Sequence, residues 1–208
     1  MYQLNETAAR ASEQRSERIV EPGEYIGILT CAEDITSKRG ARGIDCVFET
    51  ENKHIAYFTL WTFGTEGKEL FGYSQLNALM TCLGIKSLTL SKGAVCKWDR
   101  GYKRMLDMPA DLFKDLMHKR IGVLFDTETY YKPDGTPVVK AVPAHFFQAD
   151  TGLMASELLD GKVQPQQKEK LIKRLRHRPA KEGSAPPAAA SQSDFESLPY
   201  DSLNDIPF

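Results

Sequence analysis

Apolar side chains recur with a period of two along several stretches of the chain, which is typical of β-strands. Turn residues separate these stretches, most clearly in the sequence Pro133-Asp134-Gly135-Thr136-Pro137. Gly27, inside the first stretch, is expected to mark a bulge or a sharp bend. The pattern predicts five strands, at residues 25–35, 44–50, 54–63, 120–132 and 138–147.

The strand predicted at 54–63 is apolar on both faces. One face holds Ala56, Phe58 and Leu60, and the other holds Ile55, Tyr57, Thr59, Trp61 and Phe63. Because a half-buried strand usually has one polar face, we expect that one of these two faces serves a purpose other than core packing.

Helical spacing is found at fewer places. Residues 74–83 predict a helix with Ser74 as its N-cap and Gly84 as its C-terminal stop. Residues 85–108 are expected to form a long connecting segment, after which Pro109 begins a second short helix. Residues 154–159 are expected to form one or two further helical turns. This second helix would bury Leu112, Phe113, Leu116 and Met117. Three strands, a helical connection and a final hairpin follow the order of an OB-fold, so we expect a mainly β protein with short helices, built on a five-stranded OB-fold barrel.

The composition agrees with one domain and its tails. The chain has 208 residues, of which 41% are hydrophobic and 26% charged. We expect an N-terminal arm at 1–18, the OB-fold domain at 19–160, a linker at 161–199 that is first basic and then rich in Ala, Pro and Ser, and an acidic tip at 200–208. The chain has no apolar run of membrane-spanning length and no apolar signal core near residue 1, so we expect a cytoplasmic protein that does not contact membranes.

The net charge of −1 conceals a strong sorting of charge along the chain. Residues 165–182 contain seven basic and two acidic side chains, whereas residues 183–208 contain four acidic side chains and no Lys or Arg. Screening confines the influence of exposed charges to about 8 Å at physiological salt, so local patches matter more than the total. The segment 164–178 is either a helix that forms on contact with DNA or a basic spacer.

Cofactor and metal chemistry is not indicated. Cys31, Cys46, Cys82 and Cys96 are dispersed without a Cys-x-x-Cys pair, and the four histidines have no ligand spacing. The chain also lacks a phosphate-cradling glycine loop. We therefore expect no cofactor, no metal and no enzymatic activity.

Single-stranded nucleic acids are bound by cations that pair with phosphates and by flat rings that stack on bases. The basic residues Lys38, Arg39 and Arg42 lie in the expected loop between the first two strands, and Tyr57 and Trp61 share a face of the third. Tyr131, Lys132 and Lys140 flank the last hairpin loop. The densest group of basic and aromatic residues comprises Lys97, Trp98, Arg100, Tyr102, Lys103 and Arg104. These positions are the candidate nucleic-acid contacts, although a Tyr or Trp on a strand more often serves packing.

The sequence Asp205-Ile206-Pro207-Phe208 follows a stretch whose composition is typical of disorder. A short apolar segment that follows acidic residues is typical of a peptide ligand. A pocket of the partner can enclose the Phe208 ring while an Arg of the partner pairs with a carboxylate of the segment. The segment resembles the C-terminal tip of bacterial single-stranded DNA-binding proteins, and differs from it at Leu203 and Asn204, where that tip usually has more Asp.

Together, the tip and the expected barrel resemble the OB-fold single-stranded DNA-binding proteins of tailed bacteriophages. The resemblance implies a protein that coats single-stranded DNA in the cytoplasm of a bacterial host cell. It also implies that the tip recruits host or phage proteins of replication, recombination or repair. Over the body the resemblance is one of layout, so it does not identify the residues that touch DNA, and a homo-oligomer is left open.

Two other functions are compatible with the residues. Asp126 and Glu128 share a strand face and would need Asp45 or Glu49 to hold Mg²⁺ in a nuclease. Alternating Asp-Thr-Glu-Thr is, however, also what an exposed strand face looks like. The second alternative is a recombination mediator or adaptor that uses the tip and binds DNA only weakly.

Overall fold

The structure is a computed structural model that describes residues 17–99, 101–132 and 134–180, and in it the chain is mainly β with a few short helices. The strands are β1 (Glu17–Arg18), β2 (Gly23–Thr36), β3 (Arg42–Thr50), β4 (His54–Phe63), β5 (Ser91–Asp99), β6 (Arg104–Leu112), β7 (Arg120–Tyr131), β8 (Pro137–Phe147) and β9 (His177–Arg178). The helices are α2 (Phe71–Leu83), the 3₁₀ helix η1 (Lys114–Leu116), α3 (Ala155–Leu159) and α4 (Lys168–Ile172).

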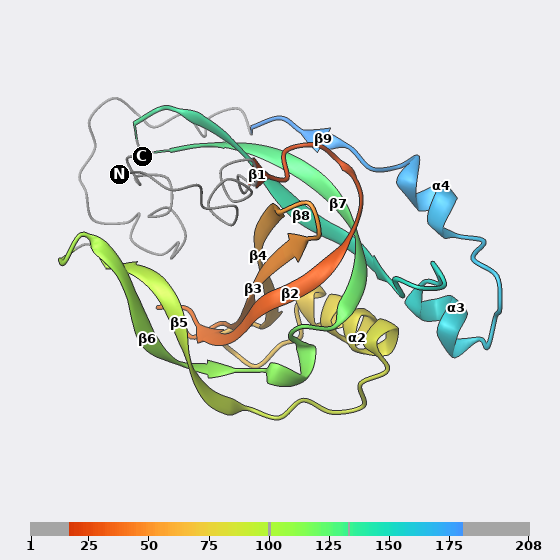
Figure 1. The fold of residues 1–208 in the computed structure, drawn as a ribbon, viewed down its shortest axis with the longest axis horizontal. Coiled ribbons are helices and arrows are strands. Elements are labelled where there is room, and N and C mark those ends of the chain that lie inside the picture. The colour runs from red at the N-terminus through yellow and green to blue at the C-terminus, as the bar shows by residue number, and fades with distance from the viewer. Residues whose placement is uncertain (1–16, 100, 133, 181–208) are drawn as a thin grey trace, which may run out of the picture.

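The strands form one curled, open sheet in which β2 is the central element (Figure 1). One path through the sheet runs β1-β4-β3-β2-β6-β5, while β7 pairs with the first part of β2 and also with β8 and β9. The residue at position 27 must be glycine, because a Cβ there would lie 2.2 Å from the carbonyl oxygen of Glu49 in β3. The bulge that bends β2 lies a little further on, between Leu29 and Cys31.

The five strands predicted from the sequence are all present, as β2, β3, β4, β7 and β8. The helix predicted at 74–83 is also present, but it begins at Phe71 and its N-cap is Leu70 rather than Ser74. Its predicted stop is confirmed, since Gly84 adopts the left-handed conformation at φ 67° that glycine accommodates without steric cost.

The helix predicted to begin at Pro109 is wrong, because Pro109 lies within strand β6. Strands β5 and β6 form a long β-hairpin in which Pro109 is paired with Ala94. Proline has no N–H to give to a ladder, so this pair is one of the alternate pairs that exchange no hydrogen bonds, and the Pro109 nitrogen points away from β5. Of the residues expected to be buried by that helix, Leu112 and Leu116 are buried nonetheless, from β6 and η1.

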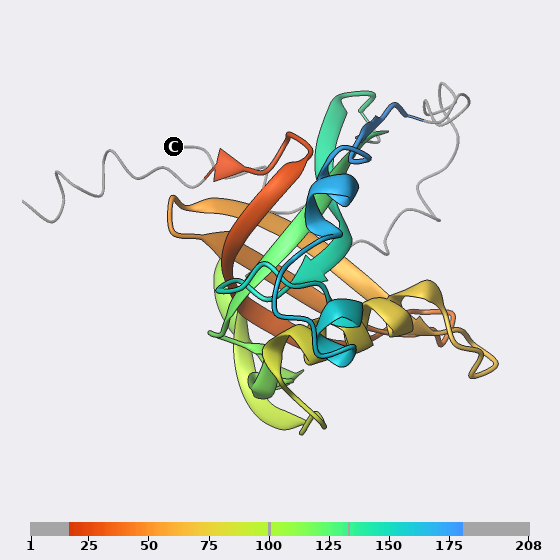
Figure 2. The same cartoon turned by 90° about the vertical axis from the view of Figure 1, so that its right-hand side faces the viewer.

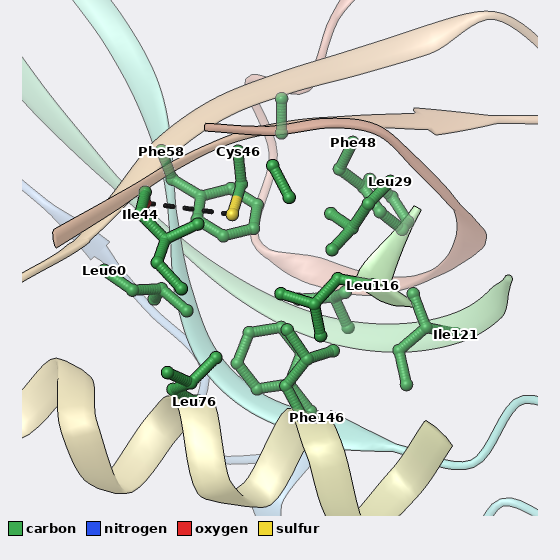
Figure 3. Close-up of a cluster of buried hydrophobic side chains, with 14 of the residues drawn as sticks. Leu29, Ile44, Cys46, Phe48, Phe58, Leu60, Leu76, Leu116, Ile121 and Phe146 are labelled. Atoms are coloured by element: carbon green, nitrogen blue, oxygen red, sulfur yellow. Dashed lines mark hydrogen bonds between the residues drawn. The ribbon is translucent and has the colours of Figure 1, made fainter. Parts of the chain in front are cut away.

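The main core lies on the inner face of the sheet and is closed by α2 (Figure 3). Ala56, Phe58 and Leu60 of β4 point into it, so this is the core face of the two apolar faces that the sequence indicated. Leu76 reaches the core from α2, and Phe146 from β8. Burying a large apolar side chain contributes about 1.5–3 kcal/mol, so this layer of Leu, Ile and Phe residues fixes the curl of the sheet.

Residues 154–178 contain α3, α4 and β9. α3 lies beside α2 and packs on the main core with Ala155 and Leu158, whereas β9 pairs in parallel with β7 (Figure 2). Leu171, Ile172 and Leu175 pack on a cluster of three buried residues, Leu124, Phe147 and Met154. We call residues 161–178 the basic strap. Within the segment 164–178, residues Lys168–Ile172 form helix α4, and the segment is folded against the sheet.

A buried carboxylate anchors the start of the basic strap. Glu157 is 0% exposed and accepts backbone N–H groups from Met154 at 3.0 Å, Gln166 at 2.7 Å and Gln167 at 3.1 Å. Burial alone raises the pKa of Glu157, but these N–H groups and Lys162 outweigh it and the pKa is lowered. The ionised carboxylate therefore stabilises the folded strap.

The far end of the basic strap is held by β7. The Nη2 of Arg178 lies 2.7 Å from Oδ2 of Asp126, whose other oxygen accepts the N–H of Arg176 at 2.9 Å. His177 contacts the hydroxyls of Thr127 and Thr129 at 2.8 and 3.0 Å. Residues 161–180 of the expected linker thus lie on the domain, and the rest of that linker is outside the described residues.

Candidate nucleic-acid interface

The outer face of β4 carries a row of two aromatic rings. Tyr57 and Trp61 lie on this face, and both are half-buried. The guanidinium of Arg18 lies 5.5 Å from the centre of the Tyr57 ring. Burial raises the pKa of Tyr57, against the opposing effect of Arg18, so the phenol is neutral at physiological pH.

The indole ring of Trp61 lies against β3 at a position where β3 has no side chain. Its register partner in β3 is Gly43, where an added Cβ would lie 2.9 Å from the indole ring. Its backbone is also covered closely, because a Cβ on Gly72 of α2 would lie 2.4 Å from the Trp61 carbonyl oxygen. Gly43 thus leaves room for the indole ring, and Gly72 allows α2 to approach the backbone of Trp61 closely.

The basic loop between β2 and β3 lies beside Trp61. Lys38, Arg39 and Arg42 are exposed, and Arg42 directly precedes Gly43, the register partner of Trp61. Ser37 orders the loop, because its hydroxyl accepts the N–H of Ala41 at 3.0 Å and its own N–H is donated to the Ala41 carbonyl at 2.8 Å. The structure therefore brings together the first basic group and one of the two β4 rings that the sequence indicated.

The outer face of β2 and β3 also carries three carboxylates, which sequence reasoning did not place there. Each has a partner: Glu33 pairs with Lys97, Asp45 accepts a hydrogen bond from Thr59, and Glu49 pairs with Lys53. Their alternation with core residues in β2 and β3 was the signal that would have placed them on this face. Phosphates would meet cations at the ends of the aromatic row rather than at its centre.

The β5–β6 hairpin extends away from the side of the molecule that carries α3 and α4 (Figure 1). Tyr102 near its tip is 71% exposed, and the guanidinium of Arg104 lies 5.6 Å from the centre of its ring. Lys103, in the same turn, is exposed. Arg100 lies outside the described residues.

Trp98 and Lys97 are neighbours in β5 and therefore point to opposite faces of the hairpin. Trp98 is half-buried and pairs with Met105, while Lys97 turns toward the sheet and Glu33. The six candidate residues of this region were predicted to act from a loop, but Lys97 and Trp98 lie in β5 and Arg104 in β6. Of the described members, Tyr102, Lys103 and Arg104 are exposed together at the tip.

The third group lies around the β7–β8 turn. Tyr131 ends β7 and Lys132 follows it, and both are half-buried. Lys140 pairs with Glu128 at 2.8 Å and lies 5.6 Å from the centre of the Tyr130 ring. The charge of Lys140 is therefore shared with a carboxylate inside the hairpin.

The carboxylates considered for a metal site lie on two strands, with Asp45 and Glu49 on β3 and Asp126 and Glu128 on β7. Among the residues that the structure describes, no group of three or more His, Cys, Asp or Glu side chains is arranged to hold a metal ion. Asp126 and Glu128 are engaged by Arg178 and Lys140.

Arg18 is a contact that sequence reasoning missed, since it was assigned to the N-terminal arm. Its strand β1 pairs in parallel with β4, with Arg18 in register with Ile55. The signal available in the sequence was only its positive charge.

The expected tip residues Asp205, Ile206, Pro207 and Phe208 lie outside the described residues. Within the described ranges, no helix is both long and apolar enough to cross a membrane. Comparison with models of known families and with curated proteins found no match.

Proposed function

We propose that this chain is a sequence-independent single-stranded DNA-binding protein built on an OB-fold. The order β2, β3, β4, α2, β7, β8 is the strand and helix order of that fold, and β2 pairs with both β3 and β7 as a barrel's first strand does. In this proposal the approach of β4 to β8 closes the barrel. The hairpin β5–β6 is then an insertion between the helix and the fourth barrel strand.

The observation that carries the proposal is the aromatic row of β4 with cations at both ends. Arg18 lies over Tyr57 at one end. Arg42 lies at the other, in register with Phe63 and next to Gly43, the register partner of Trp61, and the exposed Lys38 and Arg39 lie in the adjoining loop. The two rings are four positions apart in the strand, so their Cα atoms are about 13 Å apart. Bases stacked on such rings gain about 1–3 kcal/mol each, independently of sequence.

The hairpin tip and the β7–β8 turn extend this surface in the proposal. Tyr102 with Lys103 and Arg104 would contact one flank of the strand, and Tyr131 with Lys132 the other. The segment Asp205–Phe208 would recruit proteins of replication, recombination or repair, because its acidic and apolar residues suit a pocket that offers an Arg.

A second function, an adaptor with weak DNA affinity, is favoured by one observation. Glu33, Asp45 and Glu49 place three carboxylates on the face that would receive the DNA. Lys97 and Lys53 are paired with Glu33 and Glu49, so these two cations are engaged by carboxylates of the chain rather than open to phosphates. An adaptor would keep the tip-dependent partners and lose the tight binding of single strands.

A fluorescence titration separates these functions. We expect oligo(dT) to quench tryptophan emission at submicromolar protein, with weaker binding of duplex DNA, and Trp61→Ala to weaken dT binding by about 1–3 kcal/mol. Trp98→Ala, made in parallel, tests the other candidate tryptophan, and the two variants together show which ring accounts for the quenching. Binding that needs tens of micromolar protein would favour the adaptor. If the oligonucleotide is shortened in the presence of Mg²⁺, and if EDTA prevents this shortening, the protein is instead a nuclease.

A further inference from the structure

The strand β5 is an edge strand along its whole length. All nine of its residues, Ser91 to Asp99, pair with β6, and the path through the sheet ends at β5. Within the described ranges, its other edge belongs to no ladder. An edge of this kind presents unpaired N–H and C=O groups to any strand that can approach.

The other edges of the sheet contain proline or are covered by another strand. β5 has neither of these devices, and its two lysines, Lys92 and Lys97, are engaged by Asp111 and Glu33. The edge strand β8 contains Pro137 and Pro143, and the nitrogen of Pro109 faces the outer edge of β6. The edge of β4 is covered at its start by β1. β5 contains no proline and is longer than an average strand. Natural sheets protect such edges unless they are used.

The hydrogen-bonding direction of each β5 residue follows from Pro109. Its pair with Ala94 exchanges no hydrogen bonds, so the main-chain groups of Ala94 point to the free edge. Because the direction alternates along a strand, the same holds for Lys92, Cys96 and Trp98. A regular antiparallel ladder on this edge must therefore match even-numbered residues with even-numbered residues.

We propose that β5 pairs antiparallel with β5 of a second copy of this chain, about a twofold axis at Val95. Val95 is the midpoint of the strand, so this register pairs all nine residues and forms about eight main-chain hydrogen bonds. It sets Ala94 opposite Cys96 and Lys92 opposite Trp98. Small side chains then meet at the centre, and Lys92, whose ammonium group lies 2.7 Å from Oδ1 of Asp111, lies opposite a ring rather than a like charge.

The surroundings of β5 suit this pairing. Ala94 and Cys96 are exposed, and the side chain of Lys92 is 89% exposed. Lys97, which would lie opposite Gly93, is engaged by Glu33 on the inner side of the hairpin. The interface is small, so we expect a dimer that dissociates in the micromolar range.

Two matched double variants test the register. Positions 94 and 96 are exposed in the hairpin, so charged residues there leave the fold intact. Ala94→Lys with Cys96→Lys places lysine opposite lysine at both central pairs, and we expect the molar mass to fall to that of one chain, 23.3 kDa. Ala94→Lys with Cys96→Glu places lysine opposite glutamate, and we expect the dimer mass to persist.

The measurement is light scattering of the full chain over a micromolar concentration series without DNA. Wild type that stays at the mass of one chain throughout would overturn the proposal, as would two double variants with the same mass. A Cys96–Cys96 disulfide formed by the wild type under mild oxidation would also overturn it, because that bond requires an axis at Cys96. In the proposed register the two Cys96 residues lie diagonally, about 7–8 Å apart, which is too far for an unstrained disulfide.

Discussion

The ammonium group of Lys97 lies 2.7 Å from Oε2 of Glu33 and ties the β5–β6 hairpin to the outer face of β2. The side chains are 27% and 10% exposed, so the pair is only partly screened by water. Behind it, burial and the Glu33 charge raise the pKa of the Cys31 thiol to about 11. A lysine that the sequence offered as a phosphate contact is therefore engaged with a carboxylate of its own chain.

Breaking this pair is expected to destabilise the protein without changing its affinity for DNA. Lys97→Met leaves the nearly buried Glu33 without its cation, and we expect unfolding to become easier by about 1–2 kcal/mol, reduced from the fully buried case by partial solvation. Adding Glu33→Gln is expected to restore part of the loss. Urea unfolding of the four proteins of this cycle measures the coupling. Equal effects of Lys97→Met with and without Glu33→Gln would contradict it.

The basic loop is expected to supply phosphate contacts. Replacing Lys38, Arg39 and Arg42 together by Ala should lower the slope of log affinity against log salt by about 2, since each contact on a single strand contributes about 0.7. The control is Lys86→Ala with Lys119→Ala, two exposed lysines outside the candidate groups. Titrations of dT oligomers at several salt concentrations give the slope. An unaltered slope in the triple variant would remove this loop from the interface.

The strands could be predicted from the sequence because alternate side chains of each strand point to two faces of the sheet, and at least one of these faces is apolar. In β4 the alternation separated Ala56, Phe58 and Leu60 from Tyr57 and Trp61, but it did not show which of the two apolar faces is the core. The β5–β6 hairpin was missed because its inner face holds few large apolar residues. Pro109, which usually opens helices, lies in β6 with its nitrogen turned outward.

The site could be predicted only in part, since contacts between distant segments leave no local pattern. Nothing near Lys97 in the sequence points to Glu33, which lies 64 positions earlier. Similarly, the charge of the strap suggested a DNA contact or a spacer, while Leu171, Ile172 and Leu175 pack on β7 and β8. Three apolar residues among many cations were a weak signal of this docking.

The acidic segment is expected to bind partners independently of DNA. Phe208→Ala removes the ring that a partner pocket would enclose. It leaves the four acidic residues of 183–208 in place. We expect bacterial proteins retained by the intact chain in a pull-down to be lost, while dT affinity stays the same. The control is Phe195→Ala, which removes a ring outside the Asp205–Phe208 segment. Identical partner sets for intact protein and Phe208→Ala would argue against the recruiting function.

Acid is expected to release the basic strap through Glu157. The pKa of this carboxyl is lowered in the folded protein, so its stabilising effect is fully present above the pKa of the unfolded chain. The effect is lost as the pH falls through the lower, folded pKa. Glu157→Gln replaces one acceptor oxygen by an NH₂ group that cannot accept the N–H of Met154, Gln166 or Gln167.

We therefore expect Glu157→Gln to lower the free energy of unfolding by about 1–3 kcal/mol at pH 7. The difference from wild type should shrink as the pH falls below the ordinary range for a glutamate, because the wild-type carboxyl is then protonated as well. Urea unfolding across this range measures it, with the exposed Glu169→Gln of α4 as the control. Hydrogen exchange should locate the loss at the N–H groups of Gln166 and Gln167. A difference that is constant with pH would show that shape, and not charge, makes Glu157 important.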